Sequence, residues 1–350
     1  MRAMILAAGL GTRLRPLTDG VPKALVRVAG RPVMEHTLEL LAAHGFRELY
    51  VNVHHHAESI MGHFGDGSRW GVEITYSHEA ELLGTAGGVK KLEGSLGKGT
   101  FLVVSGDALT DLDLTSLWDF HRRKGGLATL VLTPVEDPSL YGVVITDEDG
   151  RITGFQEKPP RERALSDLAN SGIYVFEPEA LKMIPADSFY DFGSQLFPRF
   201  LEEGRDFYGY RHSDYWNDVG SLEVYRQGNF DALLGRVRVR ILAEEREPGV
   251  FLGEDVEVAE GAEVKGPLYL GDGCRVERGA VLQGPLLLGA GTRVGEGARL
   301  SRSVLWEGCA VGREAVLEEV LAGAEARVEE GAHAAPGTVL GHRGLFSGAA

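Results

Sequence analysis

The sequence contains very little cysteine: Cys274 and Cys309 are the only two in 350 residues. Two cysteines are too few for a disulfide scaffold or for a cysteine-rich zinc site. A reducing compartment is therefore expected, and we predict a cytoplasmic protein. Long apolar runs are lacking as well, since no stretch reaches the roughly 18 residues of a spanning helix and the first residues lack a signal-peptide layout. The sequence predicts a soluble protein without a membrane partner.

Positive charge is also scarce. The chain has 36 Lys and Arg against 51 Asp and Glu, which gives a formal net charge of −15. A nucleic-acid backbone requires clustered Lys and Arg, so this balance argues against a nucleic-acid partner. A chain this acidic that handles phosphates must depend on a few placed cations, on backbone amides or on a bound metal.

The first 235 residues alternate between short apolar runs and amphipathic stretches. Such alternation, with a continuous apolar first run, predicts an α/β fold with a parallel sheet covered on both faces. The expected strands are 3–8, 49–53, 101–105, 128–133 and 173–176. The expected helices are 32–44, 116–123 and 221–234.

A six-residue repeat begins after a charged stretch near residue 240. Its aliphatic positions are Val258, Val264, Leu270, Val276, Leu282, Leu288, Val294 and Leu300. Gly or Pro stands three residues after most of them, and repeats of this kind build a parallel β-helix with one repeat per side of each coil. We therefore expect a first domain at 1–236, a linker at 237–249, a β-helix at 250–335 and a tail at 336–350.

A glycine-rich loop follows the first apolar run. Gly9 and Gly11 permit close backbone approach, so that consecutive amides can face an anion. Arg13 adds a fork suited to phosphate oxygens, and Lys23 adds a point charge. The loop is not a dinucleotide fingerprint, because that pattern needs glycine where Leu14 stands.

The string from Gly9 to Lys23, GLGTRLRPLT followed by PK, resembles the signature of the sugar-1-phosphate nucleotidylyltransferases. Further segments are similar to the base-binding, metal-binding and sugar-binding motifs of that family. They are GTAGG at 84–88, VSGD at 104–107, EKP at 157–159, NSG at 170–172 and WNDVG at 216–220. The strings LLGTAGGVK, SGDALTDLDL and FQEKP are most similar to mannose-1-phosphate guanylyltransferases. The resemblance implies a Rossmann-like domain with a mostly parallel mixed sheet, followed by a left-handed parallel β-helix.

The resemblance also implies roles for individual residues. Nucleotide binding is assigned to Ala8, Gly9, Gly11, Thr12, Arg13, Lys23, Gly84, Thr85 and Asp107. Sugar binding is assigned to Gly142, Glu157, Lys158, Asn170 and Gly172. Asp107 and Asp218 are the implied ligands of Mg²⁺, which usually takes one or two carboxylates together with phosphate oxygens.

The implied catalytic residues are three cations that contact phosphates. Arg13 is assigned to the β- and γ-phosphates of the nucleoside triphosphate (NTP), Lys23 to the phosphates on the α side, and Lys158 to the sugar phosphate. The nucleophile, a sugar-phosphate oxygen, is already an anion, so positioning and electrostatics should dominate and no general base is required.

The implied reaction joins an NTP and a sugar 1-phosphate, forms an NDP-sugar and releases pyrophosphate. GTP and mannose 1-phosphate are the first substrate pair, which would give GDP-mannose. The alternatives are glucose 1-phosphate with UTP, dTTP or ATP, or a catalytically silent regulatory homologue. An acyltransferase role for the repeat domain is disfavoured, because His333 and His342 fall near or within the expected tail. The β-helix is instead expected to mediate homo-oligomerisation.

Overall fold

The computed structural model describes residues 1–348 and divides into two compact units. The first unit comprises Met1–Leu10 and Thr37–Asp218, and the second comprises Gly11–His36 and Val219–Ala350. The chain thus enters the second unit twice. The expected first domain at 1–236 therefore differs from the first unit, because the segment that carries Arg13 and Lys23 is grouped with the β-helix.

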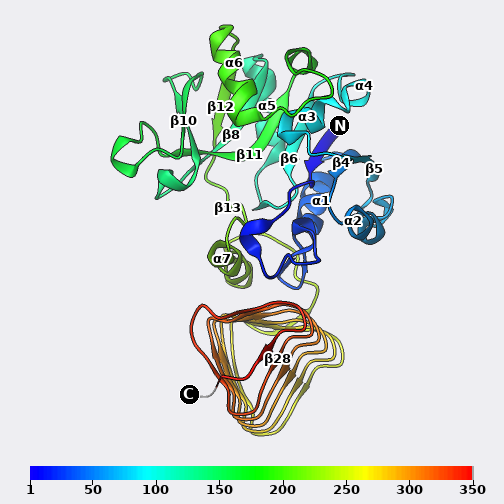
Figure 1. Cartoon of the computed structure of the whole chain (residues 1–350), viewed down its shortest axis with the longest axis vertical. Helices are drawn as coiled ribbons and strands as arrows, with labels where there is room; N and C mark the ends of the chain where they lie inside the picture. The colour runs from blue at the N-terminus through cyan, green and yellow to red at the C-terminus, as the bar shows by residue number, and fades with distance from the viewer. Residues whose placement is uncertain (349–350) are drawn as a thin grey trace. The chain divides into compact units, whose positions relative to one another are not determined.

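The first unit is built on a mixed sheet of nine strands (Figure 1). The central β1 is parallel to β4 and β6, and β11 joins the other edge of β6 in the antiparallel sense. The strands are β1 (Arg2–Leu6), β4 (Glu48–Val53), β5 (Glu73–His78), β6 (Phe101–Ser105), β8 (Ala128–Pro134), β9 (Gly142–Thr146), β10 (Ile152–Glu157), β11 (Leu168–Phe176) and β12 (Phe207–Arg211). All five predicted strands are present, and the predicted mixed, mostly parallel Rossmann-like sheet is confirmed.

Helices connect these strands and cover the sheet. They are α1 (Val33–Ala43), α2 (Ala57–Phe64), α3 (Gly84–Lys90), α4 (Glu93–Leu96), α5 (Leu114–Lys124) and α6 (Phe197–Glu202). The predicted helices at 32–44 and 116–123 correspond to α1 and α5. Asp113 caps α5 by accepting hydrogen bonds from the amides of Thr115 and Ser116, which fixes where that helix begins.

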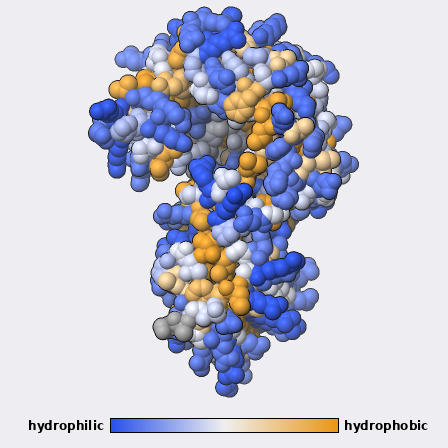
Figure 2. All heavy atoms as spheres, in the orientation of Figure 1, coloured by the Kyte–Doolittle hydropathy of each residue, from blue (hydrophilic) through white to orange (hydrophobic). Residues whose placement is uncertain are grey.

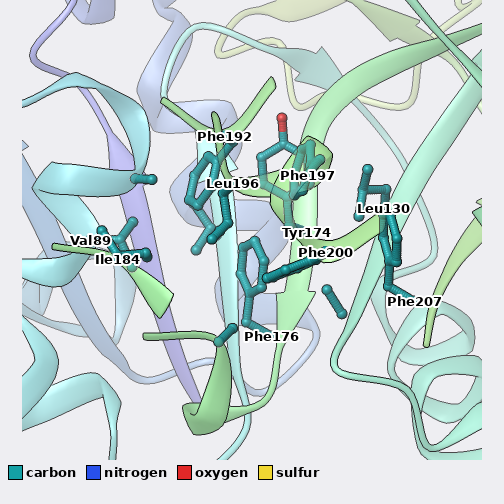
Figure 3. Close-up of a cluster of buried hydrophobic side chains, with 14 of the residues drawn as sticks. Val89, Leu130, Tyr174, Phe176, Ile184, Phe192, Leu196, Phe197, Phe200 and Phe207 are labelled. Carbon is teal, nitrogen blue, oxygen red and sulfur yellow. The ribbon is translucent and has the colours of Figure 1, made fainter. Parts of the chain in front are cut away.

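An aromatic cluster forms much of the core beneath β8, β11 and β12 (Figure 3). Its rings come from strands far apart in sequence and from α6 and the turn before it. Phe176, Phe192 and Phe197 stack with interplanar angles of 24° or less, and Phe207 is fully buried beside them. Fully burying side chains of this size contributes about 1.5–3 kcal/mol each. The strands that position the site are therefore anchored from below by a rigid core.

The second unit contains α7 (Leu222–Leu233) and stacked coils of short parallel strands (Figure 1). Each coil adds strands to three sheets, as expected for a left-handed β-helix. One sheet contains β14 (Glu244–Glu247), β15 (Val250–Leu252), β18 (Leu268–Leu270), β21 (Leu286–Leu288), β24 (Val304–Leu305), β27 (Leu321–Ala322) and β30 (Val339–Leu340). A second contains β16 (Glu257–Val258), β19 (Arg275–Val276), β22 (Arg293–Val294), β25 (Ala310–Val311), β28 (Arg327–Val328) and β31 (Leu345–Phe346). The third contains β17 (Glu263–Lys265), β20 (Val281–Gln283), β23 (Arg299–Ser301), β26 (Val316–Glu318) and β29 (His333–Ala334).

The strand register explains why the six-residue spacing breaks after Leu300. Val276 pairs with Val294, but Val294 pairs with Val311, so the next coil is one residue shorter. Most of the repeat aliphatics are buried as predicted, whereas Val258, in the first coil, is 40% exposed. A terminal coil has a neighbour on one side only, which accounts for this exposure.

Two expected boundaries of the β-helix differ from the structure. β30 and β31 lie within 336–346, so the expected tail is the continuation of the coil. β14 lies within the expected linker and pairs with β15 in the antiparallel sense. Both segments have weak apolar periodicity, so the sequence did not reveal them. Their strands form by backbone pairing with neighbouring strands of the coil.

Apolar residues are exposed in small groups on the visible face, which is mainly hydrophilic (Figure 2). The most exposed large apolar residues, Leu140, Leu165, Phe189 and Leu345, are dispersed along the sequence. Within residues 1–348, none of the helices combines the length and the apolar character needed to cross a membrane.

Candidate active site

The two predicted metal ligands lie at the end of one short antiparallel ladder. Asp107 follows β6, and the chain then forms β7 (Leu109–Thr110), which pairs with β13 (Trp216–Asn217). Leu109 faces Asn217 in this register. The next position in this register sets Asp218 opposite Ala108, which directly follows Asp107. Both carboxylates are half-buried, and the ladder brings them together although they are far apart in sequence.

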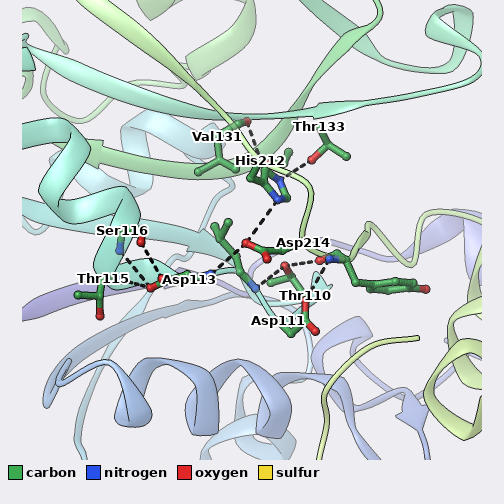
Figure 4. A network of polar contacts seen from close by, with 12 residues as sticks. Thr110, Asp111, Asp113, Thr115, Ser116, Val131, Thr133, His212 and Asp214 are labelled. Atoms are coloured by element: carbon green, nitrogen blue, oxygen red, sulfur yellow. Dashed lines mark hydrogen bonds and ion pairs between the residues drawn. The ribbon is translucent and has the colours of Figure 1, made fainter. Parts of the chain in front are cut away.

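A polar network fastens the chain on either side of this ladder (Figure 4). Thr110 Oγ1 donates to the carbonyl of Tyr215 at 2.6 Å, and the Tyr215 amide donates to Asp111 Oδ1 at 3.0 Å. The Asp113 amide donates to Asp214 Oδ2 at 3.3 Å. Asp111, which lies in the loop after β7, therefore holds the segment that leads to the second carboxylate.

His212 belongs to the same network and lies between Thr133 and Asp214. Its Nε2 lies 2.9 Å from Thr133 Oγ1, and its Nδ1 lies 4.0 Å from Asp214 Oδ2. Burial lowers the pKa of His212, while the carboxylates of Asp214 and Asp111 oppose that shift. The ring is therefore neutral at pH 7, and it supports the loop without adding charge beside the site.

The backbone is strained immediately after Asp218. Val219 has a φ of 45° and is fully buried. A β-branched residue in the left-handed region is a genuine outlier that costs on the order of 1–3 kcal/mol, and such strain concentrates at functional sites. The strained backbone next to Asp218 is therefore consistent with a functional role for that carboxylate.

The predicted sugar-binding segment 170–172 lies beside these carboxylates. It is a bulge in β11, where the register shifts between Asn170 and Tyr174. Gly172 has a φ of 75°, and a Cβ there would lie 3.1 Å from Ser105 Oγ, just before Asp107 in the chain. Asn170 Oδ1 accepts the Gly172 amide at 3.2 Å, which fixes the shape of the bulge.

Trp216 links this bulge to the β7–β13 ladder. Its indole Nε1 donates to the carbonyl of Ser171 at 2.9 Å, and its ring lies 5.8 Å from that of Tyr141. The amide of Lys158 in turn donates to the carbonyl of Tyr141 at 3.1 Å. These contacts place Trp216 beside the predicted sugar-binding segment.

The remaining sugar-site residues are on the adjacent hairpin of β9 and β10. Glu157 pairs with Gly142, and a Cβ at Gly142 would lie 3.0 Å from Glu157 Oε2. Lys158 has a φ of 44°, and its Nζ lies 3.9 Å from Glu157 Oε1. Both side chains are exposed, so a carboxylate and an ammonium group face solvent at the edge of the sheet.

The predicted base-binding residues begin α3. Gly84 has a φ of 74°, and a Cβ there would lie 2.6 Å from the carbonyl of Tyr190. Thr85 Oγ1 donates to Asp191 Oδ2 at 2.8 Å and accepts the amide of Phe192 at 2.9 Å. The base-binding segment is thus supported by the loop at 188–192, where an added side chain at residue 84 would clash.

Sequence reasoning missed Asn52 and Glu79, two buried polar residues behind the glycine loop. Asn52 Oδ1 accepts the Ala7 amide at 2.8 Å, and its Nδ2 donates to Glu79 Oε1 at 2.8 Å. Glu79 Oε2 accepts the Leu83 amide at 3.0 Å. This relay fixes the residues that precede Ala8 and Gly84. The sequence signal that could have revealed this relay is a polar Asn within the apolar run at 49–53.

The other loop residues belong to the second unit. Thr12 and Arg13 are exposed on a single 3₁₀ turn, Thr12–Leu14, which follows the left-handed Gly11. Lys23 begins a second such turn and is half-buried. The structure therefore presents the Arg13 guanidinium to solvent on a short, well-defined turn.

Comparison with known proteins identifies the family. The family model described as nucleotidyl transferase matches residues 2–233. The chain belongs to the nucleotidyl transferase family. A UTP–glucose-1-phosphate uridylyltransferase of Synechocystis is 44% identical over 283 residues, which cover 77% of this chain and 73% of the relative. A mannose-1-phosphate guanylyltransferase of Mycobacterium tuberculosis is 36% identical over 277 residues, which cover 76% of each chain.

A solved structure of this fold is also similar. The crystal structure of HddC from Yersinia pseudotuberculosis superposes with a TM-score of 0.57 at 24% identity and covers 65% of this chain and 97% of its own. The predicted class of enzyme, a nucleotidyltransferase, is confirmed by the family match. The contacts above show how a nucleotidyl transferase sheet joins its predicted metal and sugar segments.

Proposed function

We propose that the chain transfers a nucleotidyl group from an NTP to a sugar 1-phosphate and releases pyrophosphate. The observation that carries this proposal is the β7–β13 ladder, which sets Asp107 and Asp218 together beside the bulge at 170–172. A metal-binding pair next to a sugar-binding segment is the arrangement that this reaction requires. Both curated relatives named above are nucleotidylyltransferases of hexose 1-phosphates, which supports the same proposal.

Mg²⁺ is the metal that this donor set fits. The ion takes one or two carboxylates and completes its octahedron with water and phosphate oxygens. Asp107 and Asp218 would hold it, and no cluster of three acidic, His or Cys side chains suited to a metal occurs among residues 1–348. When bound, the ion would supply positive charge to the phosphate oxygens of the two substrates.

The cations of the chain perform the remaining electrostatic work in this proposal. Lys158 binds the sugar phosphate and orients its oxygen toward the α-phosphorus. Arg13 binds the β- and γ-phosphates, where negative charge develops as pyrophosphate leaves, and Lys23 binds on the α side. In-line displacement by an existing anion needs no proton transfer, so orientation and charge stabilisation supply the rate.

The substrate pair is the finer part of the proposal. GTP and mannose 1-phosphate come first, because of the motif strings LLGTAGGVK and FQEKP and the similarity to the Mycobacterium tuberculosis guanylyltransferase. UTP and glucose 1-phosphate come second, favoured by the higher identity to the Synechocystis uridylyltransferase.

A matrix of GTP, UTP, dTTP and ATP against mannose and glucose 1-phosphates, followed by pyrophosphate release with Mg²⁺ present, tests this proposal. We expect one pair to exceed the others in kcat/KM by at least about tenfold, a difference of 1.4 kcal/mol. Lys158→Ala should lower kcat/KM for the sugar phosphate in that pair. Failure of every pair to release pyrophosphate would overturn the proposed function.

A further inference from the structure

Residues 11–23, which carry the predicted phosphate-binding cations, fold around Gly11. Thr18 Oγ1 donates to the Gly11 carbonyl at 2.8 Å. A Cβ on Gly11 would lie 3.1 Å from Lys23 Cβ and 3.2 Å from Thr18 Cγ2, so both side chains pack directly against this glycine. The segment therefore folds as one piece, and a contact that holds part of it also positions the backbone that carries the two cations.

The last coils of the β-helix contact this segment through His342. The Ala324 amide donates to His342 Nδ1 at 3.1 Å, so the neutral ring carries its proton on Nε2. That nitrogen lies 2.8 Å from the carbonyl oxygen of Leu17 and donates to it. Leu17 as a residue is only 1% exposed. A Cβ on Gly341 would lie 3.3 Å from Pro16 Cβ, so the coil backbone also packs against the segment.

A second set of contacts from the coils holds the chain just after this segment. Arg27 Nη2 lies 3.2 Å from Glu307 Oε1. Burial raises the pKa of the Glu307 carboxyl, but the Arg27 guanidinium, together with a backbone hydrogen bond, lowers it, and the net shift is downward. Trp306 Nε1 donates to Tyr225 Oη at 2.8 Å, and this hydroxyl donates to the Arg27 carbonyl at 2.6 Å. The β-helix thus holds the middle of the segment, at Pro16 and Leu17, and the chain just after it, at Arg27.

We propose that His342 is a positioning residue that fixes the phosphate-binding segment through the carbonyl of Leu17. The β-helix then contributes to nucleotide binding without contacting the nucleotide. The inference rests on the proposed function, in which Arg13 and Lys23 bind the NTP. It assigns a role to the part of the sequence that was expected to be a tail.

Two conservative variants of the full chain separate the two hydrogen bonds of this ring. In His342→Gln, the side-chain amide can reach the position of Nε2 and donate to Leu17, but the acceptor for Ala324 is displaced. In His342→Asn, the carboxamide oxygen can replace Nδ1 and accept from Ala324, but the donor to Leu17 is lost. Arg343→Gln, which breaks the exposed pair of the next residue with Glu325 of the neighbouring coil, is the matched control.

The readouts are the dissociation constant of the NTP and the KM values of both substrates. We expect His342→Asn to weaken NTP binding and to raise its KM by about tenfold, as for the loss of one hydrogen bond, with the sugar 1-phosphate KM unchanged. His342→Gln and Arg343→Gln should stay within about twofold of the unsubstituted chain. Thermal unfolding of all three variants controls for folding.

A merely structural role of His342 in the coil gives the opposite ranking, because Gln would then be the damaging variant. That ranking, or equal NTP affinity in the Asn and Gln variants, overturns the inference and leaves the proposed function intact. Absence of NTP binding by the unsubstituted chain overturns the proposed function and the inference with it. The two failures are therefore distinguishable.

Discussion

At the scale of single residues, the proposed function requires two side chains that act as a pair. Asp107 and Asp218 lie at the same end of the β7–β13 ladder, and neither alone provides two carboxylates. Groups that serve one function as a unit show strongly non-additive losses when they are removed.

Asp107→Asn and Asp218→Asn should each lower kcat by at least about a hundredfold, because each weakens the hold on a charge that stabilises the transition state. The double variant should be little worse than either single one. Steady-state kinetics on purified full-length variants, with circular dichroism to verify folding, measure both effects. Near-normal turnover in either single variant would remove that residue from the metal assignment.

Another residue-scale prediction concerns stability and pH. His121 is buried, with Nδ1 2.9 Å from Thr129 Oγ1 and Nε2 3.0 Å from Glu177 Oε1. Burial lowers the pKa of His121 despite the nearby carboxylate of Glu177. Near pH 6.5 the unfolded chain therefore binds a proton at His121 more readily than the folded chain does. The free energy of unfolding consequently decreases as the pH falls through that range.

We expect the free energy of unfolding of the unsubstituted chain to fall more steeply between pH 7.5 and 5.5 than that of His121→Gln, which cannot titrate. Urea unfolding at several pH values measures the two slopes. Identical slopes would mean that this ring titrates in the folded chain as it does in the unfolded one.

At the scale of elements, the short ladder of β7 and β13 joins the two carboxylates that we propose as metal ligands. Thr110→Val keeps the shape of the side chain but loses the hydrogen bond to the Tyr215 carbonyl. Loss of a bond of this kind is worth about 1 kcal/mol. A lower kcat, by roughly fivefold, is expected, since the carboxylate of Asp218 would be held less firmly.

Ser116→Ala is the matched control for this substitution, because its hydroxyl donates to the carboxylate of Asp113, whereas the network beside the ladder uses the amide of Asp113. The control should lower stability slightly and leave kcat unchanged. Equal losses of kcat in both variants would show that the ladder has no special role.

The elements also show what the sequence could and could not predict. The first strand, α5 and the β-helix carry their own apolar periodicity, so they were predictable. β7 and β13 have two residues each, too short for any periodic signal. The Asn52–Glu79 relay joins a strand end to a loop far along the chain, and such long-range hydrogen bonds leave no local pattern. The left-handed conformation of Val219 was not predictable either, because a β-branched residue rarely adopts it.

At the scale of the whole molecule, the repeat and the glycine loop were recognisable as separate motifs. Their membership of one unit was not predictable, because it depends on contacts such as that of His342 with Leu17, which join the two ends of the chain. For this reason a fragment that ends at residue 236 is unsuitable for assigning a role to the β-helix. Such a fragment would lack the groups that hold residues 11–36.

Assembly is a property of the whole chain, and homo-oligomerisation through the β-helix stays a prediction. A parallel coil presents flat faces and a terminal edge to a second copy. Sedimentation velocity of the full chain should give a species larger than 37.8 kDa. Reversing charges on one face, as in Arg275→Glu, should shift it toward monomer, whereas a monomer at all concentrations would contradict the prediction.

The central claim is that two distant aspartates hold one divalent cation beside the sugar site. The most direct measurement is an anomalous difference map from a crystal of the full chain grown with Mn²⁺, a sugar 1-phosphate and an unreactive NTP analogue. The account predicts a single strong peak within coordination distance, roughly 2.0–2.3 Å, of both Asp107 and Asp218. A peak that contacts neither carboxylate, or only one of them with the substrates bound, would contradict it.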